Sequence, residues 1–394
     1  MIDYSKKLNS TACALKPSGI RKFFDITEKM SDVISLGVGE PDFKTPWHIR
    51  HAGIVSLEGG KTRYTANRGL LELRREISGF SKRKYNLSYD IDEILVTVGG
   101  SEAIDLAVRT VVEPGDEVLI PQPSFVCYEP IVRLAGGVPV IIELTEKNNF
   151  VLTPEQIKSR ITSKTKAIVV PYPCNPTGGI MVRKDLEKIA EVIKENDLFV
   201  ISDEIYAELT YSENRHVSIG EIEGMRERTI IASGFSKTYS MTGWRLGYAL
   251  APREIATVMT KIHQFAIMSA PTTSQYAAIE AIKNGDNDIK KMVEEYDMRR
   301  RIIVEGFRKI GLHCFEPLGA FYVFPCIRST GLTSEEFCEQ LLYSKKVAMV
   351  PGNAFGDCGE GFVRASYCYS VDHIKKALNR TEEFINELKT SKSK

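Results

Sequence analysis

One lysine stands out because its place in the chain suits an amine that reacts with an aldehyde. Residues 233–248 read SGFSKTYSMTGWRLGY, so Lys237 comes just past an apolar run and has small neighbours. A lysine in such a place can lose its water shell, and a desolvated amine is a good nucleophile. Taken alone, this residue is better explained as a solvated loop lysine, because most lysines are exposed.

Other polar groups follow apolar runs where strands are expected to end. Asp203 ends the run LFVISD, and Asn175 follows KAIVVPY in a turn with prolines. In TVGGSEAIDLAV a glycine turn leads into an expected helix, so the free N–H groups near Gly100, Ser101 and Glu102 form an anion cradle. Ligands of open α/β sheets bind beyond the carboxyl ends of the strands, so these groups fit one ligand. Taken singly, Asp203 could cap the next turn and Asn175 could be an ordinary turn residue.

Short β-branched runs alternate with stretches of helical period, which predicts a mostly parallel sheet with crossover helices. Seven strands are expected, at residues 93–98, 117–121, 138–144, 166–172, 198–203, 229–234 and 246–251. Helices are expected at residues 101–112, 125–135, 154–161, 183–196 and 253–266. Because most of the strands read as buried on both faces, we predict an α/β/α layered domain.

A second pattern begins after about residue 272, with long helical segments broken at NGDN (284–287) and then a smaller α+β region. The prolines in and after GVGEPDF (37–43) indicate an extended crossing loop that joins the first residues to that region. We therefore predict a large domain over residues 47–290 and a small domain made of residues 1–46 and 291–394.

The bulk properties exclude several function classes. With 52 Lys plus Arg against 51 Asp plus Glu in 394 residues, the chain has no global charge for nucleic acid or an anionic membrane. The eight cysteines form no CxxC pair and the six histidines no HExxH, so no metal site is expected. No apolar run approaches the ~18 residues of a membrane span, and the first ten residues lack the apolar core of a signal peptide. We expect a cytoplasmic protein with reduced thiols.

The segment around Lys237 resembles the lysine motif of the class I and II aminotransferases almost letter for letter. The match runs from SLGVGEPDF (35–43) to EGFVRASY (360–367) with the elements in the expected order, and SGIRKFFD (18–25) and GAFYVFP (319–325) belong to it. The chain is most similar to the prokaryotic aspartate/aromatic aminotransferase subgroup. The resemblance implies the aspartate aminotransferase-like fold and the cofactor pyridoxal 5′-phosphate (PLP).

The resemblance also assigns roles at the cofactor. Lys237 bonds to the PLP aldehyde, and Arg245 pairs with the phosphate through its forked guanidinium. Asp203 keeps the ring nitrogen protonated, which makes the ring an electron sink. Tyr206 and Asn175 donate hydrogen bonds to the phenolic oxygen of the ring.

Two further cofactor contacts follow from the resemblance. Phe125 stacks on the ring, although a single phenylalanine could also be an ordinary core residue. Many relatives carry a phosphate-binding serine three residues before the lysine, where this chain has Gly234. We expect Ser236 to compensate.

For the substrate, the resemblance places Arg364 on the α-carboxylate, which lysine would hold poorly, with the backbone N–H of Gly37 beside it. The alternative for Arg364 is a surface salt bridge. Tyr64 in TRYTANRGLLELR resembles the tyrosine that crosses to the phosphate of the neighbouring subunit. A homodimer with shared sites is therefore implied.

The implied reaction is amino transfer in two half-reactions, with Lys237 as general base and ping-pong kinetics. A 2-oxo acid such as 2-oxoglutarate is the expected acceptor. Relatives selective for aspartate often add a second basic residue, but the corresponding places read Ser101 and QFAIMSAP (264–271). We therefore predict a pocket for apolar or aromatic donors that still accepts glutamate.

Two other functions remain open on the sequence. A C–S lyase that performs β-elimination on cystathionine could use the same lysine, aspartate and arginine, because the protein decides which bond of the PLP adduct breaks. The fold could also serve as an effector-binding module of a transcription regulator. No basic DNA-binding segment precedes residue 30, which disfavours the second alternative.

Overall fold

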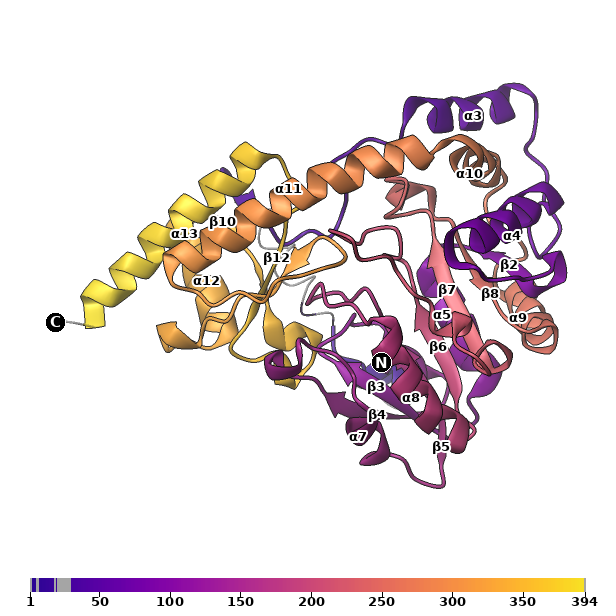
Figure 1. Cartoon of the computed structure of the whole chain (residues 1–394), viewed down its shortest axis with the longest axis horizontal. Coiled ribbons are helices and arrows are strands. Elements are labelled where there is room, and N and C mark those ends of the chain that lie inside the picture. Colours follow the sequence, from indigo (N-terminus) through magenta and orange to yellow (C-terminus); the bar gives the residue numbers. More distant parts are fainter. Residues whose placement is uncertain (1, 5–6, 18, 20–29, 393–394) are drawn as a thin grey trace.

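A seven-stranded sheet forms the centre of the computed structural model, which describes residues 2–4, 7–17, 19 and 30–392 (Figure 1). In spatial order its strands are β2 (Ile94–Thr97), β8 (Gly247–Leu250), β7 (Thr229–Gly234), β6 (Phe199–Asp203), β5 (Thr165–Val170), β3 (Glu117–Gln122) and β4 (Val138–Glu143). Only β8 runs antiparallel to its neighbours. The seven expected strands and the mostly parallel sheet are confirmed.

Helices cover both faces of this sheet (Figure 1). One face carries α5 (Gly100–Val111), α6 (Tyr128–Leu134) and α9 (Arg253–Ala266). The other carries α4 (Leu71–Tyr85), α7 (Pro154–Lys158), α8 (Arg183–Glu195) and α10 (Thr272–Asn284). Side chains of each strand alternate between the two layers, so Val169 packs under α5 while Ile168 and Val170 pack under α8. The predicted α/β/α layering is confirmed.

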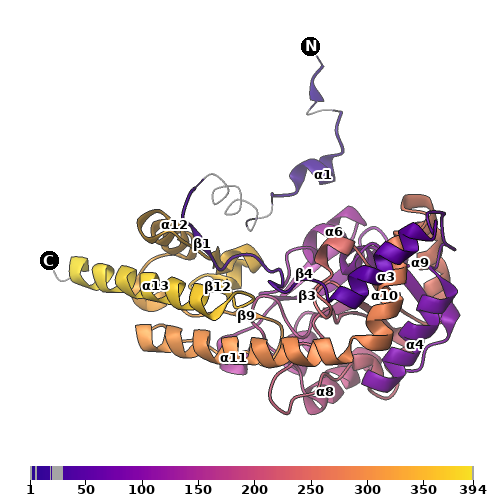
Figure 2. The ribbon, with the colours of Figure 1, turned by 90° about the horizontal axis from the view of Figure 1, so that it is seen from above.

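The break expected near residue 285 is real. Gly285 separates α10 from the long α11 (Asp286–Ile310). A Cβ at Gly285 would lie 2.4 Å from the Ala281 carbonyl oxygen and 2.7 Å from the Tyr239 ring, so only glycine lets the two helices turn here. Helix α11 then leaves the sheet and runs beside α13 (Val371–Lys392) (Figures 1 and 2).

Helices α11, α12 (Ser334–Lys345) and α13 belong to a smaller region with its own core. It contains an antiparallel sheet of β11 (Val350–Pro351), β12 (Val363–Ser366) and β9 (Tyr322–Val323). An early strand, β1 (Ile34–Ser35), pairs with β10 (Val347–Ala348). Strand β1 thus joins the C-terminal region in space. The division into domains over residues 47–290 and over 1–46 with 291–394 stays a prediction.

Some segments differ from the expected elements or lie outside them. Helix α3 (Trp47–Glu58) was not expected from the sequence, nor was α4. Of the segment 18–25 the structure describes only Gly19. No helix among the described residues is both long enough and apolar enough to cross a membrane.

Candidate active site

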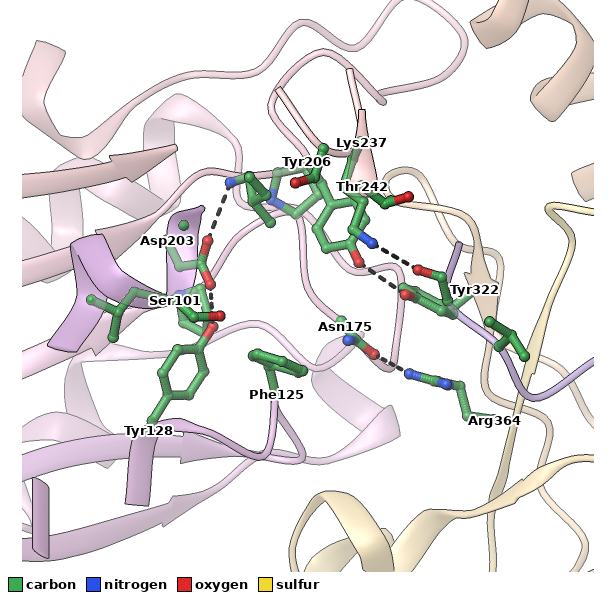
Figure 3. Close-up of a pocket in the computed structure, with 18 of the residues that line it drawn as sticks. Ser101, Phe125, Tyr128, Asn175, Asp203, Tyr206, Lys237, Thr242, Tyr322 and Arg364 are labelled. Atoms are coloured by element: carbon green, nitrogen blue, oxygen red, sulfur yellow. Dashed lines mark hydrogen bonds between the residues drawn. The ribbon is translucent and has the colours of Figure 1, made fainter. Parts of the chain in front are cut away.

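A cavity of about 280 Å³ lies beyond the carboxyl ends of β5, β6 and β7, where the sheet meets the smaller region (Figure 3). Most of the residues singled out in the sequence line it, although they come from seven separate segments. These are Gly100, Ser101, Phe125, Asn175, Asp203, Tyr206, Ser236, Lys237, Arg245 and Arg364. Gly37, Glu102 and Tyr64 are the three that do not.

Lys237 follows β7 and points into the cavity. Its Nζ donates a hydrogen bond to the Gly39 carbonyl oxygen at 2.7 Å. Burial lowers the pKa of Lys237 to about 8, and the positive charges of Arg364 and Arg245 act in the same direction. A substantial share of the amine is therefore neutral near pH 8, which is the form that attacks a carbonyl carbon.

Asp203 ends β6 on the opposite side of the cavity. Its Oδ2 accepts a hydrogen bond from the Tyr128 hydroxyl at 2.7 Å, and its Oδ1 accepts from the Ile205 N–H at 3.2 Å (Figure 3). Burial raises the pKa of Asp203 to about 6, although these two hydrogen bonds oppose the rise. Such a carboxylate would be stabilised by a cationic group from a ligand.

The start of α5 provides an anion site. No side chain caps this helix among the described residues, and the residue just before it, Gly99, has a φ of +79°. A Cβ at Gly99 would lie 2.7 Å from an Arg245 guanidinium nitrogen, so glycine lets that cation reach the helix end. Free N–H groups, the helix dipole and a guanidinium together suit a phosphate.

The packing of glycines behind this anion site explains one departure from the family motif. A Cβ at Gly234 would lie 2.9 Å from the Cα of Gly247, so a serine side chain has no room there. Ser236, two residues later, lines the cavity instead.

Arg364 in β12 is almost fully buried at the other end of the cavity. Its Nη1 donates to Asn175 Oδ1 at 2.8 Å (Figure 3). Its Nη2 donates to the Gly37 carbonyl oxygen. Its Nε has no hydrogen-bond partner among the described residues. A buried guanidinium with spare donors suits a carboxylate, so the alternative of a surface salt bridge does not describe Arg364.

The three predicted residues outside the cavity have other contacts. Glu102 accepts hydrogen bonds from the Val98 N–H and from His263 Nδ1, so its side chain anchors the start of α5. The Gly37 N–H donates to Ser35 Oγ at 3.2 Å. Tyr64 is 82% exposed, on the loop before α4.

Two cavity tyrosines were missed in the sequence. Tyr128 donates to Asp203, and the Tyr322 hydroxyl lies 2.9 Å from that of Tyr206. A signal existed for Tyr322, because GAFYVFP places one polar tip in an apolar strand and a buried hydroxyl usually has a partner. Tyr128 gave no signal, since its partner lies 75 residues away.

The comparisons with known proteins agree with this geometry. The family model "Aminotransferase class I and II" matches residues 31–380. The chain belongs to this family. The aminotransferase is 51% identical over 374 residues to YugH of Bacillus subtilis and 46% identical over 378 residues to the aspartate aminotransferase of Pyrococcus abyssi, in both cases over 95% of this chain and 97% of the relative. It superposes on the aromatic aminotransferase of Pyrococcus horikoshii with a TM-score of 0.89, at 44% identity, over 93% of this chain and 99% of that one.

Enzymes of this family depend on PLP, and the described residues of the aminotransferase fit that cofactor. The helix end at Gly99 with Arg245 suits its phosphate. The buried carboxylate of Asp203 suits a protonated ring nitrogen, and the Lys237 amine suits its aldehyde.

Proposed function

We propose that this aminotransferase takes its amino group from apolar and aromatic L-amino acids, accepts glutamate as well, and passes the group to a 2-oxo acid such as 2-oxoglutarate. The small number of cationic side chains in the cavity is the main support for this proposal. Its cationic lining residues, among those described, are Lys237, Arg245 and Arg364, and each has a task on the cofactor or on the α-carboxylate. No further lysine or arginine comes from Ser101 or from residues 264–271 to pair with a second carboxylate.

We assign the reaction steps to the side chains as follows. When bound, PLP supplies an aldehyde for the amino group and a ring that takes up electron density from the substrate α-carbon. Arg364 binds the α-carboxylate and orients the substrate so that its Cα–H bond stands over the ring face. Lys237 Nζ takes the α-proton as general base, while Asp203 keeps a proton on the ring nitrogen. The two half-reactions follow one another as ping-pong kinetics.

The remaining roles at the cofactor are also part of the proposal. Phe125 stacks on the ring, and Asn175 and Tyr206 donate to its phenolic oxygen. The N–H groups of residues 100–102, together with Ser236 and Arg245, bind the phosphate. The Gly37 N–H meets the substrate carboxylate, which requires it to leave Ser35 Oγ.

A homodimer with shared sites is the second part of the proposal. Exposed apolar side chains support it, and we infer that they form one apolar patch. They lie on α3, on the loop before α4 and at the end of α9, and are Trp47, Ile54, Val55, Leu57, Tyr64, Phe265, Ile267 and Met268. The Tyr64 loop is tied to the end of α9, because Asn67 Nδ2 donates to the Met268 carbonyl oxygen and Thr272 Oγ1 to the Arg63 carbonyl oxygen. Patches of this kind mark protein interfaces, and Tyr64 would reach the phosphate of the second copy.

We also propose a reducing, cytoplasmic setting. All eight cysteines are free thiols. Free thiols persist where glutathione and thioredoxin keep them reduced.

A panel of amino acids tests the donor proposal. Each is mixed with the yellow PLP-loaded enzyme, and the loss of the cofactor absorbance is followed in a single half-reaction. We expect phenylalanine, tyrosine and leucine to react at least about tenfold faster than aspartate, because a buried carboxylate without a cation is costly. Glutamate carries the same kind of carboxylate on a longer side chain and should react, although more slowly than phenylalanine. The Ser101→Lys variant adds a cation to the cavity and should raise the aspartate rate relative to phenylalanine. Aspartate reacting as fast as phenylalanine in the unmodified enzyme would contradict the proposal.

A further inference from the structure

We infer that Tyr322 is a positioning residue that couples the two ends of the cavity, because it touches Tyr206 on the cofactor side and Arg364 on the substrate side. The inference rests on the roles proposed above for those two residues. Tyr322 lies in β9 of the smaller region, whereas Tyr206 follows β6 of the central sheet (Figure 3). One side chain therefore spans the boundary between the two parts of the molecule.

The hydroxyl of Tyr322 acts on Tyr206. The two hydroxyl oxygens are 2.9 Å apart, and both side chains are buried. Burial raises the pKa of Tyr322 to about 12 and the pKa of Tyr206 well above its ordinary value, so both are neutral phenols at working pH. A phenol has one proton to give. If Tyr206 donates that proton to the phenolic oxygen of the cofactor, it can only accept from Tyr322, and a chain of hydrogen bonds strengthens each donor along it.

The ring of Tyr322 acts on Arg364. The guanidinium carbon lies 4.4 Å from the centroid of the Tyr322 ring and 4.8 Å from that of Phe355. No acidic side chain of the described residues pairs with Arg364, whose partners are an amide oxygen and a carbonyl oxygen. The two ring faces therefore stabilise a buried cation and fix its direction.

Gly39 keeps Tyr322 in this place. A Cβ at residue 39 would lie 2.1 Å from the Tyr322 hydroxyl oxygen and 3.0 Å from its Cζ, so any larger residue would displace the phenol. The carbonyl oxygen of the same glycine accepts from Lys237 Nζ. Gly39 of the crossing loop thus contacts both the Lys237 amine and the Tyr322 hydroxyl.

Two substitutions separate the two contacts of Tyr322. Tyr322→Phe removes the hydrogen bond to Tyr206 and keeps the ring under Arg364, whereas Tyr322→Leu removes both. Tyr367→Phe is the matched control, because this buried tyrosine loses a hydrogen bond to the Ala320 carbonyl oxygen at 3.1 Å and does not line the cavity. Each PLP-loaded protein is assayed for kcat and for the KM of donor and acceptor, and its visible absorbance is titrated with pH.

We expect Tyr322→Phe to lower kcat by roughly two- to tenfold with little change in KM. The midpoint of its absorbance titration should rise by about half a pH unit. Without Tyr322 behind it, Tyr206 is a weaker donor to the phenolic oxygen of the cofactor, and that oxygen then holds the neighbouring proton more tightly. Tyr322→Leu should in addition raise the KM of both amino acid and 2-oxo acid by about tenfold. The control should leave the titration and both KM values unchanged.

Three results would overturn the inference. Tyr322→Phe could behave like the control, it could change KM without moving the titration, or Tyr322→Leu could leave both KM values unchanged. The Phe variant is conservative, so it decides the first two points even if the Leu variant does not fold. If the unmodified protein binds no PLP or transfers no amino group, the proposed function itself fails, and this outcome is distinct from the other three.

Discussion

The pKa values of the two titratable side chains Asp203 and Lys237, which line the cavity, are both shifted towards the neutral form. Burial raises the pKa of Asp203 to about 6 and lowers the pKa of Lys237 to about 8. At pH 7 each group is largely charged, although the fold favours the uncharged state. Both charges therefore carry a desolvation cost. A cofactor would remove it, because its cationic ring nitrogen would pair with the Asp203 carboxylate and its aldehyde would react with the neutral Lys237 amine.

Asp203→Asn should make the ligand-free protein more stable while it destroys activity. A carboxyl group whose folded pKa lies above its unfolded value of 3.8 destabilises the fold once it ionises, and the penalty grows from about pH 4 to pH 6 and stays constant above. The shift corresponds to at most about 3 kcal/mol. Asparagine removes the charge and can still accept from the Tyr128 hydroxyl.

Denaturant unfolding of PLP-free protein at pH 8 and pH 4 measures the effect. The gain in unfolding free energy should be present at pH 8 and vanish at pH 4, whereas kcat of the loaded variant should fall more than about a hundredfold. Asp105→Asn on α5 is the control, because its partly exposed ion pair with Arg109 contributes little. A gain that is equal at both pH values would show that the carboxylate charge is not its source.

The secondary structure elements were predictable where their pattern is periodic. The seven strands of the central sheet and the helices between them carry such patterns, as does the break at Gly285. Strands β9, β10 and β11 have two residues each and form only through pairing with distant segments. They are too short to show a periodic pattern in the sequence. Helix α3 was missed because it has no continuous apolar face towards the core: its apolar residues Ile54, Val55 and Leu57 are exposed.

The site was predictable to a similar degree. Asp203 and Asn175 follow apolar strands, and their positions alone indicate a ligand at the sheet edge. The substrate side depends on Arg364, which lies inside a short strand of the smaller region and not at the end of an apolar strand of the central sheet. Only the family resemblance identified it. The motif GAFYVFP signals a buried hydroxyl at Tyr322 but not its partner Tyr206, and Tyr128 gives no signal at all. Both partners lie more than 70 residues away, and a single sequence does not reveal such contacts.

The close packing of β8 against the start of α5 should be essential for the phosphate site. A Cβ at Gly247 would lie 2.5 Å from the carbonyl carbon of Gly99 and 2.7 Å from the N of Gly100. Gly247→Ala must therefore push the helix end away from Arg245. We expect a loss of about 2–3 kcal/mol in unfolding free energy and weaker PLP binding.

Gly243→Ala in the same segment is the matched control, because nothing lies within 4 Å of its Cβ position. Denaturant titration measures stability, and absorbance titration with PLP measures affinity. The proposed role of the glycine packing is wrong if the two alanine variants bind PLP equally well.

The exposed apolar patch around Tyr64 and Phe265 concerns the molecule as a whole, because a single copy leaves both side chains more than 80% exposed. If two copies bury this patch and each lends Tyr64 to the other, neither copy has a complete site alone. The Lys237→Ala protein then lacks its own amine but still offers a normal Tyr64. The Tyr64→Ala protein has the complementary defect.

Mixing these two proteins under conditions that exchange subunits should restore activity. Each mixed dimer contains one site with both defects and one site with none, so random exchange should give about a quarter of the activity of the unmodified enzyme, well above either parent. The assay is the rate of amino transfer before and after exchange, with size-exclusion chromatography to show dimers. Phe265→Asp in both partners provides the control, since a charge in the apolar patch should prevent the dimer and with it the recovery. Activity that stays at the mean of the two parents in intact mixed dimers would mean that Tyr64 serves its own chain or no site at all.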